Sequence, residues 1–131
     1  MSLSTLLRRG SGTQLEIMPE PSAERLAETL VSFANGEGGT VMLGVTPDGE
    51  MTGQMQLEDA ENVLQAAVRA CRPPVQTTEW QTYEDRGGVA VTFRVPRSAD
   101  LHSLADGRVL VRTSHGNEPL DGAKITHLAA T

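Results

Sequence analysis

The sequence predicts an α+β domain in which two main helices pack on a mixed, mostly antiparallel β-sheet. Three patterns indicate this class: two amphipathic helical segments, several short apolar segments of strand type, and turn residues between neighbouring strands. The order helix, hairpin, helix, hairpin, strand has too few crossovers for a doubly wound parallel sheet. A chain of 131 residues is long enough for one domain with its own hydrophobic core.

The first half of the chain contains one helix and the first strands. Residues 14–18 alternate weakly and are expected to form a strand before two prolines. Ser22 is a suitable N-cap for a helix that ends near Asn35, because apolar residues recur there at three- and four-residue spacing. The apolar run 40–45 is of strand type, and the turn after it should fold residues 50–53 back against it.

A glycine-rich corner joins this helix to its strand. We assign Asn35, Gly38, Gly39 and Gly44 to the corner, because Asn and Gly tolerate the left-handed backbone that ends a helix and reverses the chain. A phosphate-binding loop requires the opposite order, with the glycines before a helix N-terminus. Here the loop leaves a helix C-terminus, whose partial charge is negative, and Glu37 adds to it. The corner is therefore interpreted as structural.

The second half contains a second helix and a series of strands. An apolar stripe predicts a helix over residues 57–72, which Pro73 and Pro74 end. Strands are expected over residues 75–84, 89–95 and 108–113, the first two joined by a hairpin turn. The tail from 121 to 130 is expected to form a short helix.

Composition excludes several classes of protein. The single cysteine, Cys71, rules out an internal disulfide framework and lies on the stripe of the second helix as a buried, inert thiol. No long apolar run or signal peptide is seen, so we expect a cytoplasmic protein without a membrane partner. Residues 1–13 are expected to be a flexible or subunit-docking arm, and residues 14–131 the domain.

The centre of the chain resembles the Schlafen/AlbA-like family. The residues that carry the resemblance are Phe33-Ala34-Asn35, Gly38-Gly39, Gly44-Val45, Asp48-Gly49 and Gly53. Glu16 stands where the family has Glu-Phe-Lys, and residues 109–114 resemble its aromatic-x-Arg-x-Gly-Ser strand end. The resemblance extends from about residue 14 to residue 128. It implies a nucleic-acid-binding module, often a transcriptional regulator, that forms a homodimer; we expect it to act without a winged helix or ATPase attached.

The same resemblance raises the question of RNA cleavage. Schlafen proteins are associated with this activity through three clustered acids, which can hold divalent cations against a phosphodiester. Only Glu16 is clearly retained; Ser11 stands near the position of the first acid, and Asp48 could supply the third. The histidines His102, His115 and His127 lack metal-ligand spacing. We therefore expect no catalytic residues, no metal and no cofactor, and read the histidines as surface groups.

Four arginines in the last third carry the nucleic-acid hypothesis. The net charge of −6 disfavours binding to phosphates, but most of the excess acid lies between residues 16 and 86. If the strands 89–95 and 108–113 pair, their guanidiniums could form one patch, with a hydroxyl, an imidazole and the amide of Asn117 beside it. The expected binding residues are Arg94, Arg97, Arg108, Arg112, Ser114 and His115.

Two alternatives remain beside this hypothesis. The acidic segment from residue 16 to 86 could be the working surface of a protein-interaction module that does not bind nucleic acid. A degenerate metal-dependent nuclease would use Glu16 and Asp48.

Overall fold

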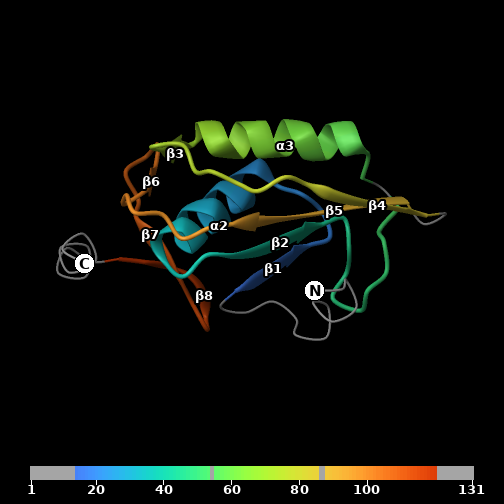
Figure 1. Ribbon diagram of the computed structural model, residues 1–131, viewed down its shortest axis with the longest axis horizontal. Helices are drawn as coiled ribbons and strands as arrows, with labels where there is room; N and C mark the ends of the chain where they lie inside the picture. Colours follow the sequence, from blue (N-terminus) through green and yellow to red (C-terminus); the bar gives the residue numbers. More distant parts are fainter. Residues whose placement is uncertain (1–13, 54, 86–87, 121–131) are drawn as a thin grey trace.

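The computed structural model describes residues 14–53, 55–85 and 88–120 and has an α+β fold. A four-stranded mixed sheet runs through the centre, and two helices and two short two-stranded sheets accompany it (Figure 1). The hairpin of β4 and β5 projects at one end of the molecule, and β7 and β8 lie at the other. The expected arm over residues 1–13 and the expected helix over 121–130 lie outside the described residues.

The central sheet has the strand order β1-β2-β5-β4. Strand β1 pairs parallel with β2, while β5 pairs antiparallel with both β2 and β4. The bounds are β1 Leu15–Met18, β2 Gly39–Leu43, β4 Gln81–Asp85 and β5 Gly88–Val95. The expected strand over 75–84 therefore begins later, and the one over 50–53 is reduced to a bridge between Val45 and Met51.

The two helices begin and end close to the predicted positions. Helix α2 spans Ala23–Asn35, and the hydroxyl of its N-cap Ser22 accepts a hydrogen bond from an amide in the first turn. Helix α3 spans Leu57–Arg69 and is shorter than expected, because Cys71–Arg72 form strand β3, which pairs with β6, Ser103–Leu104. Neither described helix is long and apolar enough to cross a bilayer.

One hydrophobic core joins both helices to the central sheet. Phe33 of α2, Ala67 of α3 and Val41 of β2 belong to the same buried cluster, together with residues of β5. A smaller cluster of Leu15, Ile17 and Met42 is separate from it. Because successive side chains of a strand point to opposite faces, Val41 and Met42 show that both faces of the sheet carry buried apolar groups.

The terminal hairpin is the main departure from the sequence-based expectation. Strand β7, Leu110–Thr113, pairs with β8, Gly116–Pro119, which the sequence patterns did not predict. The condition for one arginine patch, that the strands of Arg94 and Arg112 pair, is not met, because β5 has β2 and β4 as its neighbours. The hairpin of β7 and β8 instead contacts α2.

At the glycine corner, the glycines meet backbone and packing constraints, whereas Asn35 acts through its side chain. Gly38 and Gly44 have φ angles of 80° and 84°, which L side chains rarely adopt. A Cβ on Gly39 would lie 2.6 Å from the Phe33 ring. Asn35 is the last residue of α2, and no described residue other than glycine has a positive φ. Its side-chain amide, rather than a left-handed backbone, is what the corner uses.

Candidate functional site

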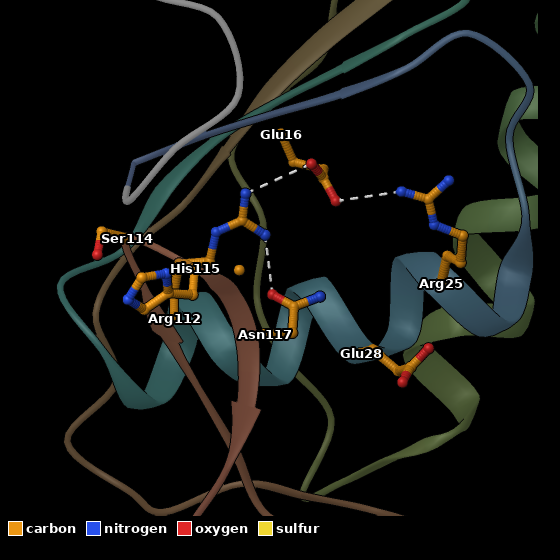
Figure 2. Close-up of a pocket in the computed structure, with 8 residues that line it drawn as sticks. Glu16, Arg25, Glu28, Arg112, Ser114, His115 and Asn117 are labelled. Atoms are coloured by element: carbon orange, nitrogen blue, oxygen red, sulfur yellow. Dashed lines mark hydrogen bonds and ion pairs between the residues drawn. The ribbon is translucent and has the colours of Figure 1, made fainter.

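A polar pocket of about 430 Å³ lies between the first half of α2 and the β7–β8 hairpin, beside β1 (Figure 2). Strand β1 is an edge strand of the central sheet, so the hairpin can reach its polar groups from outside. Three chain segments distant in sequence thus form the walls. The lining residues are Glu16, Arg25, Glu28, Arg112, Ser114, His115, Gly116 and Asn117.

Arg112 is the central cation of this site and is only 8% exposed. Its Nη2 lies 3.4 Å from Oε2 of Glu16 and donates to the backbone oxygen of Leu15 at 3.1 Å. Its Nη1 donates to Oδ1 of Asn117 at 2.8 Å. The guanidinium carbon also lies 5.0 Å from the centre of the Phe33 ring, within the range of a cation–π contact.

Two further hydrogen bonds close these contacts into a ring. Nδ2 of Asn117 donates to Oγ1 of Thr29 at 3.1 Å, and that hydroxyl donates to Oε1 of Glu16 at 3.4 Å. We call Glu16, Arg112, Asn117 and Thr29 the polar ring. Its members come from β1, β7, β8 and α2, so the ring fastens the terminal hairpin to the helix and the sheet edge. Because every member has partners of opposite polarity, the buried charges are compensated.

The rim of the pocket is charged and open to solvent. Arg25 has a 62% exposed side chain and lies 3.7 Å from Oε1 of Glu16. Glu28, one turn further along α2, pairs with Arg108 at 3.2 Å, and Arg108 also contacts Asp106 at 2.8 Å. Backbone and side-chain donors of Arg108 lower the pKa of Asp106, and this carboxylate in turn raises the pKa of Arg108. Both groups therefore remain charged at neutral pH.

The turn between β7 and β8 brings a hydroxyl and an imidazole to the pocket mouth. Ser114 and His115 are exposed, and both line the pocket. The backbone N–H of His115 donates to Oγ1 of Thr113 at 3.1 Å, which fixes the turn. Figure 2 shows these two side chains on the side of the pocket opposite Arg25.

The four predicted arginines do not form one surface. Arg112 is buried in the polar ring, which corrects the expectation that it is exposed, and Arg108 is held by two carboxylates. Arg94 is exposed on β5, next to Phe93, which is in register with Val41 and hence with Glu16. Strand alternation therefore places Arg94 on the sheet face opposite Glu16. Arg97 is exposed in the loop after β5.

The acidic residues do not fit a site for a divalent metal. Glu16 faces two guanidiniums and a hydroxyl, so its oxygens are directed at protein donors. Asp48 is exposed in the turn after β2 and does not line the pocket. Within the part of the chain that the structure describes, no group of three His, Cys, Asp or Glu residues is suitably placed for a metal ion.

His102 is buried, which corrects its interpretation as a surface residue. Its Nδ1 lies 2.7 Å from the backbone oxygen of Pro73 and its Nε2 lies 2.8 Å from Oγ of Ser98. A carbonyl oxygen only accepts hydrogen bonds, so Nδ1 carries a proton. The imidazole therefore ties the loop after β5 to the segment after β3.

Sequence reasoning missed Arg25, Glu28 and Thr29 as site residues. Thr29 offered no signal, because it lies off the apolar stripe of the helix and only the fold shows that it is buried. Arg25 precedes it by one turn and therefore shares its side of the helix. Asn117 was expected beside the arginine patch, but its internal bonds to Arg112 and Thr29 depend on strand β8, which was not predicted.

These features define an α+β domain whose polar pocket is formed by a helix, a sheet edge and a terminal hairpin. A family model for the Schlafen AlbA_2 domains matches residues 12–121, and the chain belongs to this family. It is similar in structure to the DIP2311 protein of Corynebacterium diphtheriae, with a TM-score of 0.62 at 14% sequence identity. The match covers 91% of this chain and 29% of that one, so the chain spans less than a third of that protein. No curated protein matches the chain.

Proposed function

We propose that this chain is a non-catalytic nucleic-acid-binding domain that contacts the sugar-phosphate backbone at the pocket rim. The observation that carries the proposal is the pocket itself, where Arg25, Ser114 and His115 offer hydrogen-bond donors above a charge-compensated floor. Guanidinium, hydroxyl and imidazole groups are common partners of phosphate and sugar oxygens. Membership of the Schlafen AlbA_2 family supports a nucleic-acid-related role.

Arg94 and Arg97 form a second proposed contact region. Both are exposed, and neither has an ion pair with another described residue. Their charges are therefore available to phosphates, in contrast to those of Arg108 and Arg112. Because the whole chain carries a net charge of −6, we expect weak binding that depends on these local cations.

The absence of catalysis is part of the proposal, and the environment of Glu16 supports it. A general base or metal ligand needs an oxygen that can face the substrate or the cation. Arg112 and Thr29 engage the two oxygens of Glu16 separately, and Arg25 approaches the same carboxylate from the rim. We propose that Glu16 serves as the internal counter-ion of Arg112.

A salt titration with fluorescent single- and double-stranded oligonucleotides tests the function. We expect affinity to fall as salt rises, because counterion release drives backbone contacts. The double variants Arg25→Ala/His115→Ala and Arg94→Ala/Arg97→Ala should each weaken binding and flatten the salt dependence. Arg69→Ala, an exposed arginine in the last turn of α3, is the matched control and should retain most of the affinity.

Absence of binding at low salt would overturn the proposal. It would favour the alternative of a protein-interaction module, for which α3 offers an acidic exposed face with Glu58, Asp59 and Glu61. Equal losses in Arg69→Ala and in the site variants would show that only the overall charge matters. Cleavage of the oligonucleotide in the presence of manganese, abolished by Glu16→Gln, would contradict the non-catalytic role.

We also propose that the domain acts as a homodimer, as its resemblance to the Schlafen family implies. Two copies would double the number of backbone contacts and raise the avidity of a weak site. Light scattering on a size-exclusion column measures the mass directly. A mass of one chain at all accessible concentrations would contradict this part of the proposal.

A further inference from the structure

We propose that the pocket receives one unstacked nucleotide, with its phosphate toward Arg25 and a sugar or base donor toward Glu28. This inference rests on the proposed function and names the unit of nucleic acid that the site takes. The pocket volume of about 430 Å³ lies within the range of about 300–1,000 Å³ that is typical of small-molecule sites. A duplex must unpair and unstack a base before one nucleotide can enter a pocket, so a single strand should bind more tightly than a duplex.

The mixed charge of the lining distinguishes a nucleotide from a bare anion. A phosphate alone would meet two carboxylates, Glu16 and Glu28, at its binding site. A nucleotide also carries hydroxyl and amino groups that donate hydrogen bonds to carboxylates. The ligand that satisfies this pocket therefore combines one anionic group with several donors.

Glu28 and Arg25 have binding capacity beyond their internal contacts. A carboxylate offers about four acceptor positions, and Arg108 contacts Glu28 through Oε2. A guanidinium has five N–H donors, and Arg25 approaches Glu16 with Nη2 while most of its side chain is exposed. Both side chains come from α2, three residues apart, so they lie on one side of the helix.

The polar ring makes this arrangement stable without a bound ion. Arg112 compensates Glu16 at the floor, Thr29 donates a hydrogen bond to Glu16, and Asn117 accepts one from Arg112. Ser114 and His115 at the mouth supply a hydroxyl and a ring that can hydrogen-bond or stack with the nucleotide. The floor thus sets the shape, while the rim and mouth contact the ligand.

The first experiment titrates isotope-labelled protein with adenosine monophosphate, adenosine and inorganic phosphate, and follows backbone amide signals. We expect saturable shifts at Ser114, His115, Gly116 and Asn117 with the nucleotide, and smaller or absent shifts with phosphate at equal ionic strength. Equal affinity for inorganic phosphate would show a simple anion site and overturn the inference. No shift with the nucleotide would overturn it as well.

The second experiment asks whether one substitution raises or lowers the affinity for a single-stranded oligonucleotide. Glu28→Gln removes a negative charge, which strengthens binding if Glu28 only repels phosphate, and weakens it roughly threefold to tenfold if Glu28 accepts a hydrogen bond from the nucleotide. Glu61→Gln on α3 is the matched control for the change in net charge. Arg25→Gln should also weaken binding, by a similar or larger factor.

The outcomes separate this inference from the proposed function. If oligonucleotides bind but Glu28→Gln behaves as Glu61→Gln does, the nucleotide pocket is wrong and backbone binding elsewhere survives. If no oligonucleotide binds, the proposed function is wrong, whatever the monophosphate does. A duplex that binds as tightly as the single strand, with the same loss in Arg25→Gln, would also contradict an unstacked nucleotide.

Discussion

Helix α2 takes part in two polar networks, one at its C-terminus and one at its middle, and the two differ in charge and in access to solvent. At its C-terminus, the neutral amide of Asn35 donates to the backbone oxygens of His102 and Leu110 at 2.8 and 2.9 Å and accepts from the N–H of His102 at 2.8 Å. All three residues are buried. Nearer the N-terminus, the polar ring has a charged pair at its centre and a pocket above it.

The difference indicates which network is available for function. The amide of Asn35 is used by backbone groups of the same chain, so this network fixes the position of two distant segments and offers nothing to a ligand. Three members of the polar ring are buried and Asn117 is half-buried, and the neighbouring Arg25 and Glu28 retain donors and acceptors that face the pocket. A sealed neutral network serves the fold, while an open charged one can serve both fold and binding.

The largest effect is expected from Arg112→Met. This change leaves the buried carboxylate of Glu16 without its main partner, which should lower the free energy of unfolding by about 3–5 kcal/mol. Urea denaturation measures the loss, with Arg69→Met as the exposed control. The double variant Glu16→Gln/Arg112→Met should recover part of it, because it removes the unpaired charge. A loss of stability no larger than in the control would show that the polar ring does not stabilise the fold.

Asn35→Ala should have the next largest effect. It removes three hydrogen bonds and leaves a buried N–H without its acceptor, which should cost about 2–4 kcal/mol. Asn62→Ala on the exposed face of α3 is the control and should change stability little. The comparison with the polar ring predicts unchanged nucleotide binding in the folded fraction of Asn35→Ala. If the folded fraction of Asn35→Ala bound nucleotide more weakly than the wild-type protein, the two networks would not be functionally distinct.

The ionisation of Cys71 tests how well the main hydrophobic core excludes water. Its Sγ donates to the Ala67 backbone oxygen at 3.3 Å, and burial raises the pKa of the thiol from 9.0 to about 11. The thiol contribution to stability is present below pH 9.0 and is lost as pH rises toward about 11, because the unfolded chain releases this proton first. The pH dependence of urea unfolding should therefore be steeper in this window than for Cys71→Ala. An equal slope in both proteins would show that burial does not perturb the thiol.

The smallest effect is expected from Asp106→Asn, because Asp106 contacts the pocket residue Glu28 only through Arg108. The lowered pKa of Asp106 means that its contribution is present above the ordinary value of 3.8 and lost as pH falls through the folded value. Asp106 and Arg108 are exposed, so solvent and salt screen their pair, and the urea midpoint should barely move at neutral pH. A large decrease would show that the rim, and not only the ring, holds the hairpin in place.

The local features of the sequence predicted most of the regular structure. The N-cap at Ser22, the end of α2 at Asn35 and the hairpin of β4 and β5 follow from side chains acting on their own backbone within a few residues. Strand β8 was missed because its residues, Gly116–Pro119, show no apolar alternation. The hairpin is held by the polar ring and by its contacts with α2, which no local pattern records.

The candidate site, in contrast, depends mainly on contacts between residues that are distant in sequence. The sequence identified Arg112, Ser114 and His115 as one neighbourhood, and the structure places all three at the pocket. It did not show that Arg112 is an internal group, because its partner Glu16 is 96 residues away along the chain. Because β7 pairs with β8 and β5 pairs with β2 and β4, Arg94 does not lie beside Arg108 and Arg112.

The sequence by itself determined the two helices, most strands of the central sheet, and that cations concentrate late in an acidic chain. These properties depend on neighbours within about one turn or one hairpin. Only the tertiary structure decided which arginine is buried, which carboxylate it neutralises and where a pocket remains open. Strand order and long-range packing set these outcomes, because the environment of a charge depends on groups that the fold brings beside it.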